Sequence, residues 1–285
     1  MTSTTTSPST PAPTSATGSP RLQLTALLVA ATASTIGKSL AVFAAMWGLD
    51  FSASWLLPIS IAAVGCWSTV SAARRAAPDR TQAALRAGGT CVALLAAPGA
   101  RVSDAMLIVA AGAFCWLTAA LVGDLVQART GHGVLTAPSA ENAWLDSLLV
   151  GVALFAAAFV ATHLMGYAGA HLPAWLPSPA HSQAATAGVH GYLSAAAIIG
   201  HAAVIEELLM TAAVCVLGRD ILPAWVIYTV SVSLRVAAHL YLGFAGIPVA
   251  ILGITSVYLY RKYGRILPLM TAHFAFDFGQ LFISY

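Results

Sequence analysis

Long apolar runs separated by short polar segments make up most of this chain from about residue 22 onward. A helix that crosses the hydrocarbon core of a bilayer needs about 20 consecutive apolar residues. The runs of that length are 22–46, 52–72, 103–125, 143–166, 190–217, 221–242 and 265–284. Two shorter runs, 83–98 and 246–262, are either tilted, re-entrant or true spans. The pattern therefore predicts an all-α, polytopic transmembrane helix bundle with eight or nine spans.

The N-terminal segment has a different composition. Residues 1–20 are almost all Ser, Thr, Pro, Ala and Gly, which cannot bury enough apolar surface to fold. We therefore expect a disordered tail over residues 1–20 and a transmembrane helical domain over residues 21–285. No basic segment precedes a short apolar core and a cleavage site, so the first apolar run is expected to be a retained span.

The overall composition agrees with a membrane protein. Hydrophobic residues make up 59% of the chain and charged residues 8%, whereas soluble domains carry about 25% charged residues. The net charge is only +3, and the basic residues lie between apolar runs and not along one stripe. The lipid bilayer is therefore the expected surrounding, and we expect no nucleic-acid partner. No CxxC spacing indicates a disulfide framework or a thiolate metal site.

The distribution of Lys and Arg predicts an orientation, because short cytoplasmic loops collect these residues. With Arg21 inside and nine alternating spans, only Arg101 falls on the outer side. The cytoplasmic set is Arg74, Arg75, Arg80, Arg86, Arg129, Arg219, Arg261, Lys262 and Arg265. The sequence thus predicts an integral protein of the cytoplasmic membrane with a cytoplasmic N-terminus. In this topology residues 166–188, which include His181, form an external loop.

Three of the predicted spans in the last third of the chain carry ionisable side chains. These are the pairs Glu206 and Glu207, Arg235 and His239, and His273 and Asp277. Such residues are costly inside a bilayer, so they usually face the protein interior and serve a function. The three segments are therefore the predicted active site.

The spacing within each pair constrains its geometry. Neighbours on a helix point about 100° apart, so Glu206 and Glu207 are expected to do different jobs. One would face a cavity and the other would pair, unless the two lie at a helix end near the membrane interface. A spacing of four residues places Arg235 and His239 on one helical face. A guanidinium stays charged when buried, so Arg235 needs a carboxylate, and Glu207 or Asp277 is the candidate.

Other chemistries fit the residues less well. Two histidines and several carboxylates could bind zinc, but no HExxH spacing is present. We therefore expect no cofactor, with zinc as the alternative. No GxSxG sequence supports a serine nucleophile. His163, His190 and His201 are expected to be core imidazoles.

In order, the charged segments read Glu-Glu-x-x-x-Thr at 206–211, Arg-x-x-x-His at 235–239 and His-x-x-x-Asp at 273–277. They resemble the motifs of the CAAX-processing and bacteriocin-processing (CPBP, Abi) family of intramembrane endopeptidases. That family has Glu-Glu-x-x-x-Arg, Phe-x-x-x-His and His-x-x-x-Asn or Asp, in the same order and at similar separations. The resemblance covers residues 190–284 and includes the approach to the last motif at 258–269.

The resemblance implies an endopeptidase that hydrolyses a peptide bond in a membrane-associated protein or peptide, without an obligatory metal. Glu206 would activate the water, and His239 would orient it. His273 and Asp277 would stabilise the oxyanion. Glu207 would be structural and pair with a cation.

Two positions depart from the family pattern beside the proposed base. Thr211 stands where the family has Arg, and Arg235 stands where it has Phe. A guanidinium lost from one helix and gained on a facing helix preserves a pair with Glu207. We therefore expect Glu207 and Arg235 to form a supporting pair.

Two other function classes remain open. A non-catalytic family member would be a membrane scaffold or a bacteriocin self-immunity protein that keeps the buried charges for structure. A proton-coupled transporter would also use buried Glu, His and Asp side chains. The sequence indicates neither the substrate nor the oligomeric state.

Overall fold

The computed structural model describes residues 56–73, 80–99, 103–130, 142–173, 189 and 191–283. Three predictions lie outside these residues: the disordered tail at 1–20, the first apolar run at 22–46, and the assignment of His190 to the core. Most of the predicted external loop, including His181, also lies outside them. Its first residues are helical, because the preceding helix continues to His171.

Every regular element in the described part of the chain is a helix, which confirms the predicted all-α class there. The elements are α3 (Leu56–Ala73), α4 (Arg80–Gly99), α5 (Asp104–Thr130), α6 (Ala143–His171), α8 (Tyr192–Ile205), η2 (Glu206–Ala213), α9 (Val214–Gly218), α10 (Ala224–Ala238), η3 (Leu240–Gly246), α11 (Val249–Tyr263) and α12 (Leu267–Ile283). The segment η2 is a π-helix and η3 is a 3₁₀-helix. Each predicted apolar run after the first contains one or more of these helices.

The structure does not confirm the predicted count of eight or nine spans. Three described helices are long and apolar enough to cross a membrane: Asp104–Ala128, Ala143–His171 and Tyr192–Gly218. The pair α10 and η3 makes a fourth if counted together, although the two are bent by 113°. With 15 and 17 residues, α11 and α12 are shorter than the roughly 20 residues that a full crossing needs.

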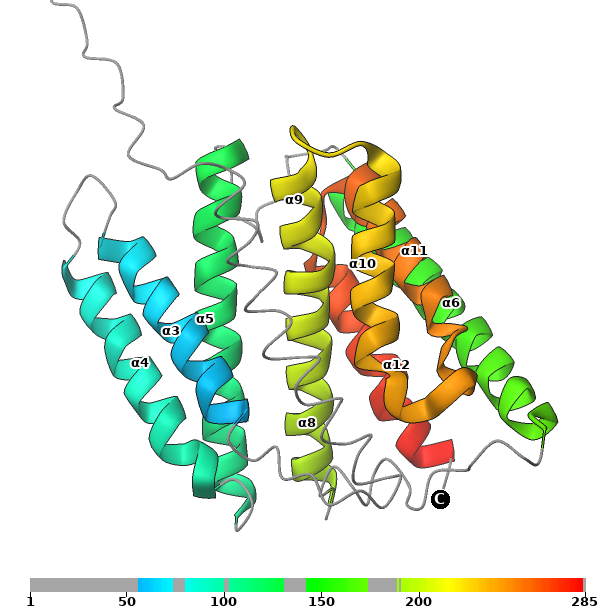
Figure 1. Cartoon of the computed structure of the whole chain (residues 1–285), viewed down its shortest axis with the longest axis horizontal. Helices are drawn as coiled ribbons and strands as arrows, with labels where there is room; N and C mark the ends of the chain where they lie inside the picture. The colour runs from blue at the N-terminus through cyan, green and yellow to red at the C-terminus, as the bar shows by residue number, and fades with distance from the viewer. Residues whose placement is uncertain are drawn as a thin grey trace, which may run out of the picture.

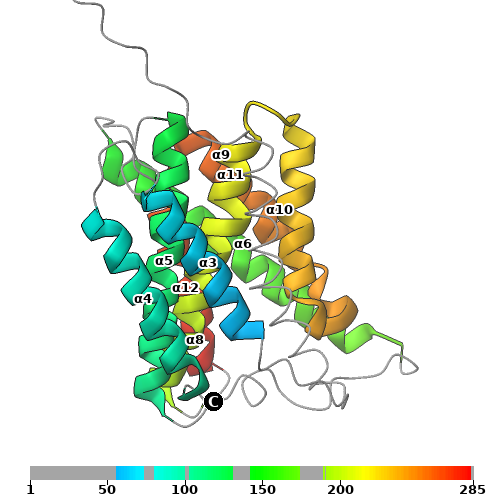
Figure 2. The ribbon, with the colours of Figure 1, turned by 60° about the vertical axis from the view of Figure 1, so that its left-hand side comes forward.

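The central element of the bundle is the continuous rod formed by α8, η2 and α9 (Figure 1). On one side of this rod lie α3, α4 and α5, and on the other lie α6, α10, α11 and α12 (Figures 1 and 2). Both groups contact the rod, α5 from one side and α10, α11 and α12 from the other. The rod therefore carries its side chains into the middle of the protein.

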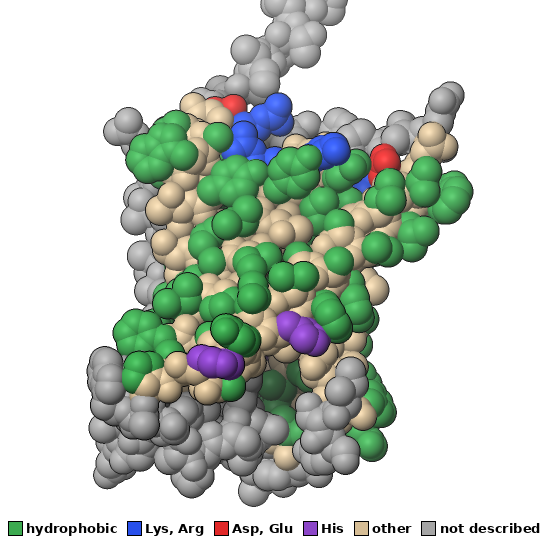
Figure 3. Space-filling view, turned by 90° about the vertical axis from the view of Figure 1, so that its right-hand side faces the viewer, with side chains coloured by type: hydrophobic (Ala, Val, Ile, Leu, Met, Phe, Trp, Pro, Cys, Tyr) green, Lys and Arg blue, Asp and Glu red, His purple; other side chains and the backbone are tan. Residues whose placement is uncertain are grey.

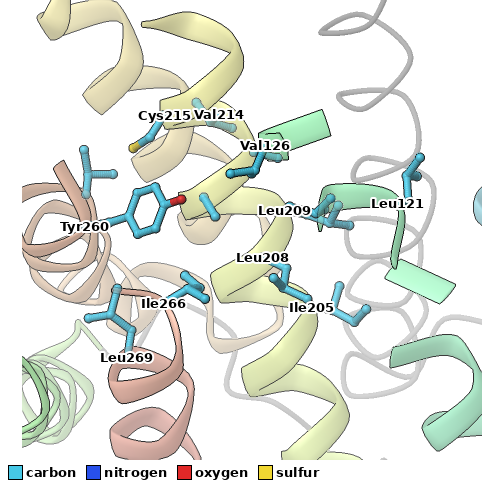
Figure 4. Close-up of a cluster of buried hydrophobic side chains, with 14 of the residues drawn as sticks. Leu121, Val126, Ile205, Leu208, Leu209, Val214, Cys215, Tyr260, Ile266 and Leu269 are labelled. Carbon is cyan, nitrogen blue, oxygen red and sulfur yellow. The ribbon is translucent and has the colours of Figure 1, made fainter. Parts of the chain in front are cut away.

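Apolar side chains join the rod to both groups (Figure 4). Leu208 and Leu209 are almost fully buried and lie between α5 and the C-terminal helices. The surrounding cluster includes Leu121 and Val126 of α5, Tyr260 of α11, and Ile266 and Leu269 beside or within α12. In a bilayer such contacts stabilise mainly through close packing, because lipid tails are as apolar as leucine. These apolar contacts therefore hold the π-helix in the middle of the bundle.

The outer surface is also apolar. Along α6, large hydrophobic side chains such as Leu148, Val152 and Phe159 are about half exposed. The face in Figure 3 is largely hydrophobic, and its Lys and Arg side chains gather along one edge. This division matches a protein whose sides face lipid and whose edge faces a polar interface.

Arg86, which the charge-based topology counted among the cytoplasmic residues, belongs to a buried ion pair. Arg86 lies within α4, is 5% exposed, and forms a salt bridge with Asp124 of α5. It also donates to the carbonyl and hydroxyl oxygens of Ser68, at 3.1 and 3.3 Å. Arg86 is therefore an internal helix-to-helix contact and not a marker of the cytoplasmic side. Counting charges between apolar runs misses such a residue, because its partner is on another helix.

Candidate active site

The two glutamates open the π-helix at the middle of the central rod. Glu206 is 7% exposed and Glu207 is fully buried. A π-helix has i to i+5 hydrogen bonds and therefore a wider turn than an α-helix, and such segments are frequent at functional sites. Nothing in the pattern of apolar residues indicated this local change of helix type.

Glu207 is the centre of a closed hydrogen-bond network. Its Oε1 accepts from Arg235 Nη2 at 2.8 Å, His273 Nδ1 at 3.0 Å and Ser256 Oγ at 3.3 Å. Its Oε2 accepts from Thr211 Oγ1 at 3.1 Å. These four donors come from η2, α10, α11 and α12. The carboxylate therefore joins four elements and has little capacity left for a water molecule.

Glu206 has a more open environment. Arg235 Nη1 donates to its Oε2 at 3.3 Å, and its side chain is 9% exposed. Among the described residues, no donor forms a hydrogen bond with Oε1. The two glutamates thus differ in environment, although one guanidinium contacts both. A planar guanidinium can do so because its N–H donors form a rigid fork.

Arg235 is fully buried in α10 and lies between the two glutamates. The structure places it against Glu207, one of the two carboxylates that the sequence offered, and adds a contact with Glu206. Within the described chain, Arg235 Nε and Ser231 Oγ are buried without a hydrogen-bond partner. These atoms lie one turn apart on α10, and buried polar atoms of this kind are usually satisfied by internal water.

His273 lies between two carboxylates. Its Nδ1 is 3.0 Å from Glu207 Oε1, and its Nε2 is 3.3 Å from Asp277 Oδ2. The imidazole is 3% exposed, whereas the Asp277 side chain is 40% exposed. This arrangement suits an imidazolium, which donates from both nitrogens. Since both nitrogens face carboxylates, an oxyanion must compete with Asp277 for His273.

His239 marks the end of α10 and a sharp change of direction. Its Nδ1 is 2.9 Å from the carbonyl oxygen of Arg235, which leaves Nε2 as the acceptor in the neutral ring. The predicted span 221–242 is therefore wrong as a single helix. Two glycines fix the bend. Gly243 has a positive φ of 60°, and a Cβ at Gly246 would lie 2.8 Å from the carbonyl oxygen of His239.

Two side chains near the site were not identified from the sequence. Ser256 donates to Glu207, but a single hydroxyl residue in an apolar helix carries no special signal. Thr211, which the motif comparison had marked as a departure from the family pattern, also donates to Glu207. Tyr241 is 7% exposed, with its ring centroid 5.7 Å from that of His239. In the sequence, the indication for Tyr241 is its position two residues after His239.

The histidines outside the charged segments serve local packing where they are described. His201 stacks on Phe114, with ring centroids 5.3 Å apart. His163 contacts the carbonyl oxygen of Phe159 on the outer helix α6, so it is not a core imidazole as predicted. The reason is that α6 is at the periphery of the bundle, which its apolar sequence does not reveal.

Metal ligation was the chemical alternative for the charged cluster. In the part of the chain that the structure describes, no three His, Cys, Asp or Glu side chains are grouped so as to hold a metal ion. None of the four cysteines, all of which lie in described helices, forms a disulfide bond.

The fold and the site together define a polytopic membrane protein with a buried centre of two glutamates, an arginine and a histidine. Residues 188–279 match the family described as type II CAAX prenyl endopeptidase, Rce1-like. The matched segment is about a third of the chain and includes all three charged segments. The match confirms the family that the motifs indicated for this region and supports a protease-type function in a membrane. No curated protein and no solved structure matches the chain.

Proposed function

We propose that this protein is an intramembrane endopeptidase in which Glu206 activates water for attack on a peptide bond. The observation that carries this proposal is the difference between the two glutamates. Glu207 accepts from four donors, whereas Glu206 has one carboxylate oxygen that accepts from none of the described residues, and its side chain is 9% exposed. A general base must reach the water that it deprotonates, and Glu206 alone of the pair has that access.

The other side chains of the centre position the base and the reacting groups. Arg235 holds Glu206 from one side, and His239 presents Nε2 as an acceptor that orients the water. His273 supplies positive charge next to the reacting carbonyl. Because Asp277 is partly exposed and 3.3 Å from His273 Nε2, a substrate carbonyl can displace it and accept from that nitrogen.

The proposed substrate is a membrane-associated protein or peptide. The name of the matched family points to chains with a prenylated cysteine near the C-terminus, followed by the short segment that is cleaved off, so we propose this class as the first to test. The proposal needs no cofactor, because the base and the cationic donors are all side chains of this protein.

The test is cleavage by the purified protein in proteoliposomes. Peptides with a farnesylated cysteine are compared with the same peptides without the lipid, and products are identified by mass spectrometry. Cleavage that persists in the presence of a zinc chelator supports the proposal. Cleavage abolished by the chelator and restored by zinc replaces it with a metallopeptidase.

Asp277→Asn is expected to retain cleavage within about tenfold of the wild type. An amide oxygen still accepts from His273, and the amide nitrogen adds a donor for the oxyanion, as in family members with Asn at this position. Asp277→Ala is the matched control and is expected to be slower, since His273 loses its second partner. The measurement is kcat/KM at equal amounts of folded protein. Equal loss in both variants would show that the carboxylate charge itself is needed.

The second candidate is a non-catalytic scaffold or immunity protein, and one contact favours it. Arg235 lies 3.3 Å from Glu206 as well as 2.8 Å from Glu207, so it partly neutralises the proposed base. In this case no peptide is cleaved, and Glu206→Gln leaves the cellular phenotype unchanged.

A further inference from the structure

We propose that an anionic phospholipid binds in the pocket between α6 and α12, with its phosphate on Arg265 and one acyl chain along α6. The pocket has a volume of about 640 Å³. Its walls come from the first three turns of α6 and from the start of α12. It is independent of the proposed peptidase function.

One end of the pocket is polar. Arg265 lines it, is half-buried, and donates from Nη1 to Ser147 Oγ at 3.3 Å. A guanidinium has five N–H donors in a planar fork, which matches a phosphate group. Arg261 and Lys262, both exposed, lie on the last turn of α11, close to Arg265 in the chain. Basic side chains also gather along one edge of the face in Figure 3. This end therefore carries the charge that an anionic headgroup requires.

The rest of the pocket is apolar. Gly151, Val152 and Phe155 line it from α6, and Ala272 and Ala275 line it from α12. Ser147 and Phe155 are eight residues apart on one helix, which corresponds to about 12 Å. One leaflet of a bilayer is about 15 Å deep, half of the hydrocarbon thickness. The length of the pocket therefore matches the part of a single acyl chain that lies nearest to the phosphate.

The lining of the pocket suits an acyl chain, because its walls along α6 and α12 are mostly apolar. An extended acyl chain is narrow and needs no hydrogen-bond partners, so it fits an apolar slot beside α6.

The pocket is also separate from the proposed active site. Residues 271 and 275, which line it, are two positions away from His273, or about 200° around the helix. The pocket thus lies on the face of α12 that points away from Glu207. A lipid bound there supports the outer side of the helix that carries His273 and Asp277.

The test is lipid retention by the full-length protein in native mass spectrometry, with phosphatidylglycerol and phosphatidylcholine of identical chains. We expect at least fivefold more retained phosphatidylglycerol than phosphatidylcholine, and loss of this preference in Arg265→Gln. Arg219→Gln is the matched control, because Arg219 is exposed but does not line the pocket. Equal loss of preference in both variants would overturn the proposal, since it would reflect overall charge alone.

A second pair of variants tests the acyl-chain slot. Gly151→Phe fills the apolar end and is expected to reduce retention of both lipids several-fold. Gly151→Ala is its control, because the new Cβ would lie 3.9 Å from the Pro268 carbonyl oxygen, an ordinary contact. Unchanged binding in Gly151→Phe contradicts the proposal. Displacement of the lipid by millimolar inorganic phosphate also contradicts it, since that result identifies a free-anion site. Neither readout involves peptide cleavage, so failure here is distinct from failure of the proposed function.

Discussion

Glu206→Gln is expected to lower peptide cleavage by about 10²- to 10⁴-fold, the usual effect of removing a general base. The protein should still fold, because Gln has the same shape and its amide oxygen still accepts from Arg235 Nη1. The Glu206 carboxylate accepts this one hydrogen bond from the described residues, so few structural contacts depend on its charge. The measurement is cleavage of a fixed peptide in proteoliposomes, together with the melting temperature of the purified variant.

Glu207→Gln is the matched comparison, since it makes the same change one residue later. Glu207 faces both Arg235 and His273, at 2.8 and 3.0 Å, so the variant removes the buried carboxylate that these two cations share. It should therefore lower the melting temperature well below that of Glu206→Gln. If Glu206→Gln still cleaves at the wild-type rate, Glu206 is not the base. If both variants melt alike, Glu207 does not have the structural role assigned to it.

Arg235→Phe is expected to destabilise the protein by about 3–5 kcal/mol, as for loss of one partner from a buried ion pair. Both Glu206 and Glu207 would lose their contact with the guanidinium. Among the described contacts, His273 would be the remaining cation beside Glu207. Typical free energies of unfolding are about 5–15 kcal/mol, so this loss is a large fraction of the stability of the protein. The measurement is thermal unfolding in detergent, with yield in the membrane fraction as a second readout.

Adding Thr211→Arg to Arg235→Phe is expected to recover much of this loss. Thr211 Oγ1 already lies 3.1 Å from Glu207 Oε2 and 3.3 Å from Arg235 Nη2, so position 211 faces the same carboxylate. The double variant also restores the family pattern at both positions. Thr211→Arg alone is the control and should be destabilised, because a second guanidinium has no free carboxylate. A double variant no more stable than Arg235→Phe would show that the guanidinium was not relocated between the two helices.

Helix boundaries illustrate what local sequence controls. α10 begins after Pro223, which has φ −64° and fixes the start. Gly264 caps the end of α11. Its φ of 66° allows its backbone N–H to donate to the Tyr260 carbonyl oxygen at 2.8 Å. These signals involve neighbouring residues, so they could be predicted. The shortness of α11 was also indicated, because the apolar run at 246–262 is shorter than a full crossing needs.

The charged centre shows the opposite case. Glu207 pairs with Arg235 and His273, which are 28 and 66 residues away along the chain. Helical periodicity shows which residues share a face of one helix, but not which faces of different helices meet. The bridge from Arg235 to both glutamates and the place of His273 between two carboxylates were therefore decided by packing. The same holds for Arg86, whose partner Asp124 lies on another helix.

The sequence by itself determined the all-helical membrane class, the order of the charged segments and the family that they resemble, because apolar run length and motif spacing are local properties. Only the tertiary structure decided which glutamate is enclosed and which is open. That difference depends on how many donors surround each carboxylate. The donors to Glu207 come from four separate elements that meet only in the folded bundle.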